Sequence, residues 1–126
     1  MSATYTLKIL ADFASAHTLR DYPGDCRRMH GHNWKVEVEV TARDLNNHGM
    51  GMDFKTIKTA TRELAKTLDH RYLNDIPPFD EINPTAENIA RYFYQQLSPV
   101  LNNDIARVSG VTLLETDRAC VKYSEE

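Results

Sequence analysis

Three histidines have the types and spacing of a metal site. His30 and His32 stand two residues apart just before an extended segment. Because side-chain direction repeats every two residues in an extended chain, their imidazoles point to the same side. His17 follows Phe13 by four residues, again an even step. If the two segments form a hairpin, all three imidazoles lie near one end of the pair. Three histidines with an open fourth position are what a catalytic zinc ion needs.

A His-x-His pair alone is weak evidence for a metal, and the third histidine and the nearby Cys26 strengthen the prediction. Cys26 lies four residues before His30 and has two interpretations. It would close a structural site as a fourth ligand, or it would stay off the metal as a general base. In the second case the cationic neighbours Arg27 and Arg28 favour its thiolate. We favour the second interpretation, although the spacing itself does not decide.

Other polar residues suit proton transfer or ligand recognition. Asp69 precedes His70, and an aspartate beside a histidine can fix its tautomer, although the dipeptide also occurs at ordinary polar helix ends. Glu115 falls among apolar residues of a predicted strand. It either faces solvent or pairs with a planar donor edge such as that of a pterin or guanine. The Arg27-Arg28 pair either binds the phosphates of a small ligand or remains solvated.

Alternation of apolar and polar residues predicts the strands that position these groups. Two strands, each with one buried face, are expected over residues 4–14 and 34–42. Residues 107–116 and 119–123 predict a closing hairpin. The segment 72–84 contains three prolines and no periodicity, so an ordered surface loop is expected there.

Apolar residues at steps of three and four predict two helices. The first lies between Asp53 and Asp69, with Asp53 as its cap and Phe54 on its buried stripe. The second follows a cap at Thr85 and is expected to end where Pro99 discourages continuation. The element order ββααββ favours an α+β fold, with an antiparallel four-stranded sheet and both helices on one face. Its edge strands favour assembly into a homo-oligomer.

Composition limits the partners and the compartment. The 126 residues with 41% hydrophobic content suit one domain over residues 1–126. A net charge of −3, with acids and bases interspersed, predicts no nucleic-acid partner. The sequence has no apolar run of about 18 residues and no secretory pattern, so we expect no membrane partner and a cytoplasmic location. Cys26 and Cys120 are not expected to form a disulfide there. His48 is interpreted as a surface residue.

Together the motifs resemble the 6-pyruvoyltetrahydropterin synthase family over nearly the whole chain. They are Phe-x-x-Ala-His17, Cys26-x-x-x-His30-Gly31-His32, Asp69-His70, Asn83-Pro84-Thr85-Ala86-Glu87 and Leu114-Glu115-Thr116. The spacing from Cys26 to His30 and the run over residues 68–77 resemble the 6-carboxytetrahydropterin synthase branch of bacterial queuosine biosynthesis. The chain departs from the family at residues 49–53 and 78–82, which do not carry the chemistry.

The resemblance implies a fold, an assembly and residue roles. The fold is the tunnelling fold, in which three subunits join their sheets into a twelve-stranded barrel and two trimers stack as a hexamer. The implied roles are zinc binding for His17, His30 and His32, catalysis for Cys26, Asp69 and His70, and pterin binding for Glu115. Arg27 and Arg28 are candidates for contact with the triphosphate. In the family these groups come from more than one subunit.

The implied reaction converts 7,8-dihydroneopterin triphosphate to 6-carboxy-5,6,7,8-tetrahydropterin, with release of acetaldehyde and triphosphate. Zinc would acidify protons near the side-chain oxygens of the substrate, Cys26 and His70 would move those protons, and Glu115 would hold the ring. One alternative is 6-pyruvoyltetrahydropterin synthase activity, which keeps the three-carbon side chain. Another is a non-catalytic zinc-binding or pterin-binding module in which Cys26 closes the coordination sphere.

Overall fold

The two N-terminal strands form one long hairpin. The computed structural model describes residues 3–24 and 27–126, and in it β1 (Tyr5–His17) pairs antiparallel with β2 (His30–Ala42) from Tyr5↔Ala42 to His17↔His30. Both strands are longer at the histidine end than predicted. Polar and small residues there, such as Ser15 and Gly31, hide the alternation that marks the rest of the hairpin.

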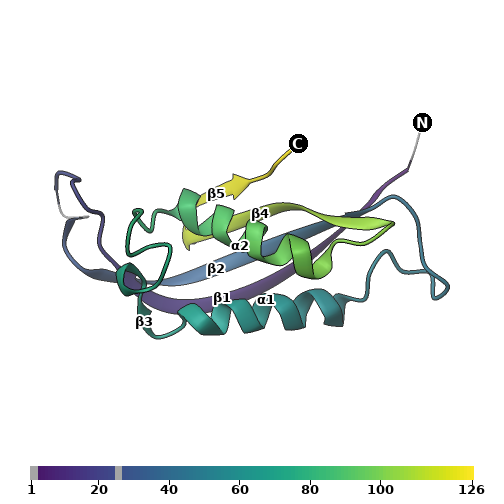
Figure 1. Ribbon diagram of the computed structural model, residues 1–126, viewed down its shortest axis with the longest axis horizontal. Coiled ribbons are helices and arrows are strands. Elements are labelled where there is room, and N and C mark those ends of the chain that lie inside the picture. The colour runs from purple at the N-terminus through teal and green to yellow at the C-terminus, as the bar shows by residue number, and fades with distance from the viewer. Residues whose placement is uncertain (1–2, 25–26) are drawn as a thin grey trace.

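The remaining elements complete a mixed sheet with two long helices. In chain order they are α1 (Phe54–Leu68), β3 (Arg71–Tyr72), the short 3₁₀ helix η2 (Leu73–Asp75), α2 (Ala86–Leu101), β4 (Ala106–Thr116) and β5 (Ala119–Tyr123). The strand order is β3-β1-β2-β4-β5 (Figure 1). The predicted closing hairpin and the predicted α+β class are confirmed.

The expectation of a purely antiparallel four-stranded sheet was wrong in one respect. A fifth strand, β3, runs parallel to β1, with Ser15 opposite Arg71 and Ala16 opposite Tyr72. Two residues are too few to produce a periodic pattern, so the sequence could not indicate this strand. The segment after it, expected as a loop, also contains η2. The pairing brings the Asp69-His70 end of α1 beside β1.

Both helices begin at the predicted caps. Asp53 accepts a hydrogen bond from Lys55 N, and Thr85 accepts one from Asn88 N. Phe54, expected to be buried, is 55% exposed, because it is the first residue of α1 and lines an open pocket at the hairpin's far end.

The second helix continues past the proline that was expected to end it. Pro99 lies inside α2, which runs on to Leu101. A proline this close to the end of a helix removes only one backbone hydrogen bond. The Ser98 hydroxyl donates 2.7 Å to the Tyr94 carbonyl, and Asn102 N donates to the Ser98 carbonyl, so the last turn keeps other partners.

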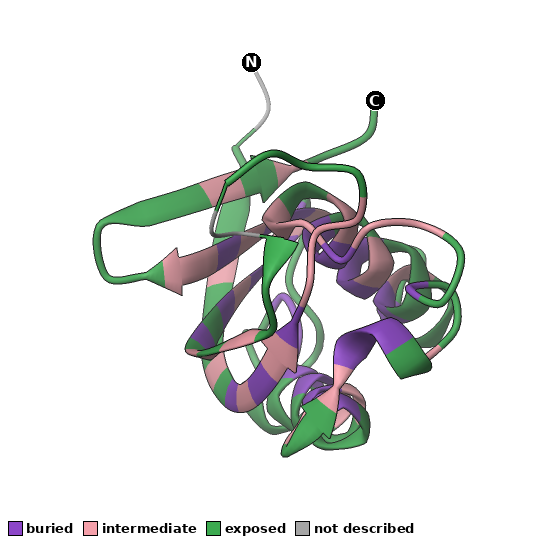
Figure 2. Cartoon of the chain, turned by 90° about the vertical axis from the view of Figure 1, so that its left-hand side faces the viewer, coloured by how far each residue is buried: buried purple, intermediate pink, exposed green. Residues whose placement is uncertain are grey.

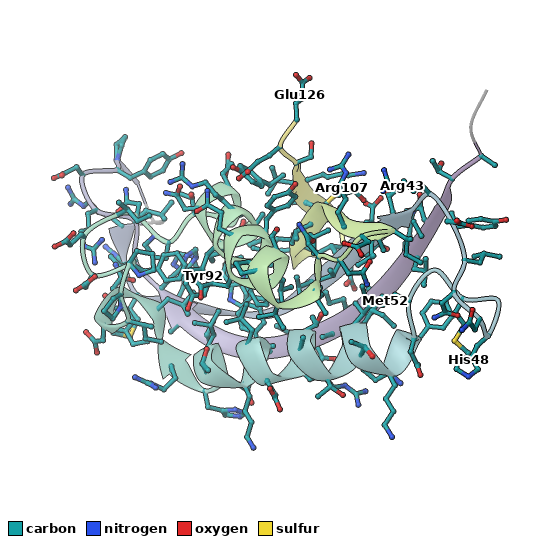
Figure 3. The ribbon with its side chains drawn as sticks, turned by 45° about the vertical axis from the view of Figure 1, so that its right-hand side comes forward. Arg43, His48, Met52, Tyr92, Arg107 and Glu126 are labelled. Atoms are coloured by element: carbon teal, nitrogen blue, oxygen red, sulfur yellow. The ribbon has the colours of Figure 1, made fainter. Side chains whose placement is uncertain are left out.

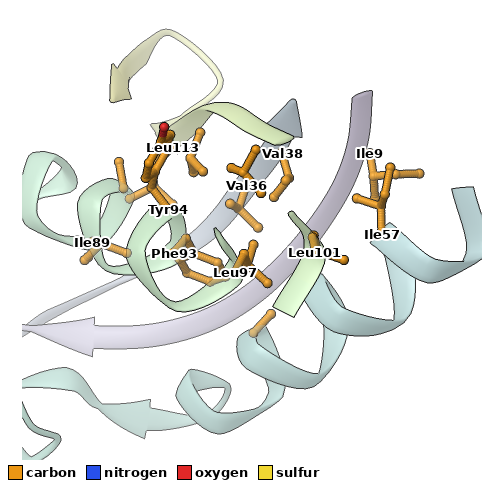
Figure 4. Close-up of a cluster of buried hydrophobic side chains, with 14 of the residues drawn as sticks. Ile9, Val36, Val38, Ile57, Ile89, Phe93, Tyr94, Leu97, Leu101 and Leu113 are labelled. Atoms are coloured by element: carbon orange, nitrogen blue, oxygen red, sulfur yellow. The ribbon is translucent and has the colours of Figure 1, made fainter. Parts of the chain in front are cut away.

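The core lies between one face of the sheet and both helices. Trp34, Val36, Val38 and Val40 of β2 are fully buried, as the alternation predicted. All four belong to one buried apolar cluster with Phe93 of α2. Figure 4 shows Val36 and Val38 within this cluster, on the side of the sheet that α2 covers. Buried and less buried residues alternate along the strands in Figure 2. Among the described helices, none has the length and apolar character needed to cross a bilayer.

Candidate metal centre

The three predicted histidine ligands come together at one end of the hairpin. His17 lies opposite His30 in the register, and His32 lies opposite Ser15. Their ring centroids are 4.5 Å apart for His17 and His30, 5.3 Å for His17 and His32, and 5.0 Å for His30 and His32. His30 and His32 share the helix-covered face with buried Trp34, because each lies an even step from it.

Backbone carbonyls fix the orientation of two of the rings. His17 Nδ1 donates to the Pro84 carbonyl at 2.8 Å, and His30 Nδ1 donates to the Arg28 carbonyl at 2.8 Å. Because a carbonyl only accepts, the proton of each neutral ring is on Nδ1 and its Nε2 carries a lone pair. The two Nε2 atoms lie 2.9 Å apart. Facing lone pairs at that distance suit a shared cation.

Glu115 lies against this cluster instead of apart from it. Its Oε1 is 3.5 Å from His17 Nε2 and 3.4 Å from His32 Nε2. One donor atom from each of the three histidines and from Glu115 lies within 4.8 Å of the others. His32 Nε2 is buried and makes no hydrogen bond within the described residues. Three imidazoles, one of them with an orphaned buried nitrogen, and a carboxylate fit the donor set of a zinc ion.

Burial favours the neutral state of His17 and His32, which a metal ligand needs. Burial lowers the pKa of His17 below its ordinary value, and the neighbouring histidines lower it further, against the opposing effects of the Pro84 carbonyl and Glu115. Burial also lowers the pKa of His32, while Glu115 opposes the shift. Both rings are therefore held neutral near pH 7, as metal ligands must be.

Asp69 and His70 form a pair at the neighbouring sheet edge. Asp69 accepts hydrogen bonds from Ala14 N at 2.7 Å and from His70 Nδ1 at 2.8 Å. The Ala14 amide and then His70 lower the pKa of Asp69. His70 has a positive φ of 57°, and its side chain is 83% exposed. Within the described part of the chain, no hydrogen bond or ion pair joins this pair to the cluster, although His70 and His32 line one open pocket.

The other predicted site residues lie in or near the loop between β1 and β2. Cys26 lies outside the described residues. Arg27 and Arg28 are exposed, and the contact described for them at the cluster is the Arg28 carbonyl bonded to His30. His48 lies in the exposed loop between β2 and α1, beyond the opposite end of β2, as its interpretation as a surface residue predicts (Figure 3).

Sequence reasoning missed two neighbours of the histidines. Trp34 packs edge-on against His17 and His32, with ring centroids 5.0 and 5.1 Å away. The Pro84 carbonyl bonds His17 from a turn far along the chain. Trp34 was predicted only as a buried strand residue. The Asn83-Pro84-Thr85 motif was noticed for its family resemblance and for Thr85 as a helix cap. Neither reveals that the Pro84 carbonyl faces the His17 ring.

Comparison with known proteins finds relatives that span nearly the whole chain. The family model described as 6-pyruvoyl tetrahydropterin synthase matches residues 6–126. The chain is 34% identical over 116 residues to 6-carboxy-5,6,7,8-tetrahydropterin synthase of Synechocystis sp., covering 88% of this chain and 86% of that protein. It is 31% identical over 138 residues to 6-pyruvoyl tetrahydrobiopterin synthase of Dictyostelium discoideum, covering both chains completely.

Solved structures give the class of fold. The structure of Caenorhabditis elegans 6-pyruvoyl tetrahydropterin synthase superimposes with a TM-score of 0.85 at 25% identity, covering 99% of this chain and 98% of that one. The chain therefore has an α+β architecture, the tunnelling fold. With the match over residues 6–126, the chain belongs to the 6-pyruvoyl tetrahydropterin synthase family.

Proposed function

We propose that the protein is a zinc-dependent lyase that converts 7,8-dihydroneopterin triphosphate and one water molecule to 6-carboxy-5,6,7,8-tetrahydropterin, releasing acetaldehyde and triphosphate. The observation that carries the proposal is the convergence of three histidines whose Nε2 atoms face one another beside Glu115. Its relatives named 6-carboxy-5,6,7,8-tetrahydropterin synthase support the choice of reaction. The product would feed biosynthesis of queuosine and related 7-deazaguanines.

His17, His30 and His32 would hold the zinc ion. When bound, zinc supplies Lewis acidity toward the oxygens of the substrate side chain. Glu115, near the C-terminal end of β4, would accept hydrogen bonds from the amino and ring N–H groups of the pterin and so orient it. Trp34 and the surrounding core exclude water from the buried side of the histidines.

Proton movement is assigned to Cys26, Asp69 and His70. Asp69 holds the Nδ1 proton of His70, which leaves His70 Nε2 free to take or give a proton. Cys26 would be the second proton carrier, through its thiolate. Arg27 and Arg28 are exposed at the same loop and would meet the triphosphate.

We also propose that the active form is a homo-oligomer, a trimer or a dimer of trimers. In the described sheet, β3 covers β1 only at Ser15 and Ala16, so residues 5–13 of β1 form an edge without a strand partner. The other edge is β5. Pairing of such edges between copies removes the liability of open strands. It would also bring Asp69 and His70 of one subunit to the histidines of another.

A second candidate is 6-pyruvoyl tetrahydropterin synthase activity on the same substrate. The full-length match to the Dictyostelium enzyme of related name supports it. That reaction eliminates triphosphate and keeps the three-carbon side chain. A third candidate, a non-catalytic zinc-binding or pterin-binding module, gains support from Glu115, since this carboxylate is close enough to His17 and His32 to fill a fourth ligand position.

The deciding experiment incubates zinc-loaded protein with 7,8-dihydroneopterin triphosphate and identifies the products by mass spectrometry. Acetaldehyde together with 6-carboxytetrahydropterin supports the proposal, and a pyruvoyl product without acetaldehyde supports the second candidate. His30→Ala is the control, expected to lose stoichiometric zinc and turnover together because two remaining imidazoles chelate weakly. Zinc binding without turnover of the substrate by the wild type would leave the binding module as the better account.

A further inference from the structure

The turn that precedes α2 connects the metal-site histidine His17 to the rest of the fold. It consists of Asn83, Pro84 and Thr85, the start of a sequence motif to which the proposed function assigns no role. The Pro84 carbonyl accepts the Nδ1 proton of His17 at 2.8 Å, and this contact is buried. The orientation of the His17 ring therefore depends on what holds the Pro84 carbonyl in place.

The side chain of Asn83 binds the chain that leaves His17. Arg20 N donates to Asn83 Oδ1 at 2.8 Å, and Asn83 Nδ2 donates to the Arg20 carbonyl at 3.0 Å. One amide thus satisfies both backbone groups of a residue three positions beyond His17. This two-bond contact between a side-chain amide and one backbone residue is called an amide pair below.

The backbone of Asn83 is held by α2. Its carbonyl accepts hydrogen bonds from Thr85 N and from Asn88 Nδ2, each at 2.9 Å. The Thr85 side chain in turn caps the helix through Asn88 N. A carbonyl with two donors at a helix N-terminus has little freedom, and Pro84 follows with its φ locked by the ring.

The Arg20 guanidinium fixes the other side of the same loop. It donates to the Phe79 carbonyl at 2.6 Å and to the Ile82 carbonyl at 3.3 Å. These bonds hold the residues just before Asn83 against the chain that leaves β1. Asn83 is therefore linked to His17 in two ways, through Arg20 to its backbone and through Pro84 to its imidazole.

We propose that Asn83 is a positioning residue for the metal centre. By holding the Pro84 carbonyl in place, Asn83 sets the tautomer and orientation of His17 for a divalent cation. The inference rests on the proposed zinc site. A proton held on Nδ1 directs the Nε2 lone pair toward His30 and Glu115, and loss of the restraint lets the ring rotate or change tautomer. Groups that hydrogen-bond a metal ligand directly typically contribute about 10–100-fold in metal affinity. Because Asn83 acts through the Pro84 carbonyl, its effect should lie at the lower end of that range.

The chain offers a matched control in Asn74. Its side chain makes the same amide pair with Thr18, with Thr18 N donating to Oδ1 and Nδ2 donating to the Thr18 carbonyl, both at 2.9 Å. It too follows α1 in sequence and binds the segment after β1. Its neighbours in the described chain do not bond the His17 ring. Asn74→Ala therefore removes an equivalent tether on the backbone beside His17, while the Asn74 carbonyl, which the Arg20 guanidinium reaches at 3.4 Å, is kept. The control thus separates loss of a backbone tether from loosening of the Pro84 carbonyl.

The test measures zinc affinity by competition with a chelating dye near neutral pH, alongside the midpoint of thermal unfolding. Asn83→Ala is expected to lower zinc affinity about 10-fold, the lower end of the range for direct partners of a ligand. Asn74→Ala, with a similar loss of thermal stability, is expected to stay near the wild type. Nitrogen-15 NMR of the metal-free protein should show His17 as the Nδ1–H tautomer in wild type and Asn74→Ala, and as a tautomer mixture in Asn83→Ala.

A milder variant covers failure of Asn83→Ala to fold. Asn88→Ala removes only the bond from Nδ2 to the Asn83 carbonyl and should lower zinc affinity in the same direction by less. Equal affinity losses in the Asn83 and Asn74 variants, or no loss in either Asn83→Ala or Asn88→Ala, would overturn the positioning role while the wild type still binds zinc. Absence of stoichiometric zinc in the wild type would instead overturn the metal centre itself.

Discussion

Glu115 is the residue whose position most changes the interpretation of the site. From the sequence it is a strand carboxylate that would meet a pterin, and in the structure its Oε1 also approaches His17 and His32 at 3.5 and 3.4 Å. Binding a pterin and binding a metal ion would use the same carboxylate oxygen atoms. The carboxylate also opposes the lowering of both histidine pKa values, so it is coupled to them electrostatically even without a metal.

Replacing Glu115 with glutamine separates the two roles. Glu115→Gln turns one acceptor into a donor that faces the donors of the pterin, which should weaken binding of a pterin analogue by about 1–3 kcal/mol. Zinc content should be unchanged, because three histidines suffice for a catalytic site. Calorimetric titration of the analogue and metal analysis of the same samples measure both. Loss of zinc would place Glu115 in the coordination sphere, and unchanged analogue affinity would make it an ordinary strand residue.

The two cysteines should respond differently to removal of the thiol. Cys26→Ala is expected to keep zinc and fold but lose turnover, because the thiolate is proposed as a proton carrier and not as a ligand. Cys120→Ala is the control, since Cys120 is exposed on β5 and should be dispensable. Metal content, circular dichroism and product formation are measured for both. Release of zinc by Cys26→Ala would favour the closed structural site.

At the scale of elements, the hairpin end that gathers the histidines also makes the metal-free fold sensitive to acid. The pKa values of His17 and His32 lie below 6.5 in the folded chain, mainly through burial. Below that pH the two histidines bind protons in the unfolded chain but stay neutral in the folded chain. The free energy of unfolding should therefore be full above pH 6.5 and fall as the pH decreases through 6.5 toward the folded pKa values.

Urea unfolding of the metal-free protein at several pH values between about 7 and 5 checks this dependence. His32→Gln should reduce the slope, because it removes one of the two groups. His48→Gln is the matched control, since His48 is exposed and far from the cluster, and it should keep the wild-type slope. A stability independent of pH in this window would contradict the argument.

The sequence predicted the elements wherever side-chain pattern controls them. Val36 and Val38 are buried at alternate positions, and Asp53 and Thr85 cap their helices, because these are local effects of backbone geometry. The strand β3 and the Pro84 contact depend on segments distant in sequence, and no local pattern records them. Phe54 was wrongly predicted to be buried. The helical spacing of apolar residues includes the first residue of α1, whether or not the sheet extends far enough to cover it.

The candidate site was predicted to a similar degree. The even spacing of His30 and His32 correctly placed both rings on one face of β2, and the hairpin brought His17 to them. The proximity of Glu115 required the pairing of β4 with β2, whose register includes a bulge between Glu39 and Val40. Register across a bulge cannot be read from alternation alone. The roles of Asp69 and His70 remain predictions, because within one described chain they bond to each other and to β1.

At the scale of the whole molecule, Asp69 and His70 do not bond to the histidine cluster of their own described chain. This predicts an active site shared between subunits. His30→Ala and His70→Ala should each be inactive alone, because one lacks the metal ligand and the other lacks the proton carrier. Mixed after reversible dissociation, the two variants should regain part of the activity, since some interfaces then combine an intact metal site with an intact Asp69-His70 pair. Native mass spectrometry confirms the hybrids.

Mixing samples of the same variant is the control for that experiment and should restore nothing. Hybrids that form without activity would mean that each chain supplies its own proton carrier across the pocket that His32 and His70 both line. Activity or inactivity of the hybrids therefore decides whether the active site is built from two subunits or lies within one.

The contact between Trp34 and the histidine cluster also gives the protein an optical property. Trp34 is the single tryptophan of the chain, and its indole lies about one ring's width from His17 and His32, with centroids 5.0 and 5.1 Å away. The tryptophan emission of the protein therefore comes from one place, the wall of the candidate metal centre. A paramagnetic ion such as Co²⁺ would quench that emission. Zn²⁺ is diamagnetic and would change it only through the electric field of the bound cation. Metal exchange can thus be followed by fluorescence without any added dye.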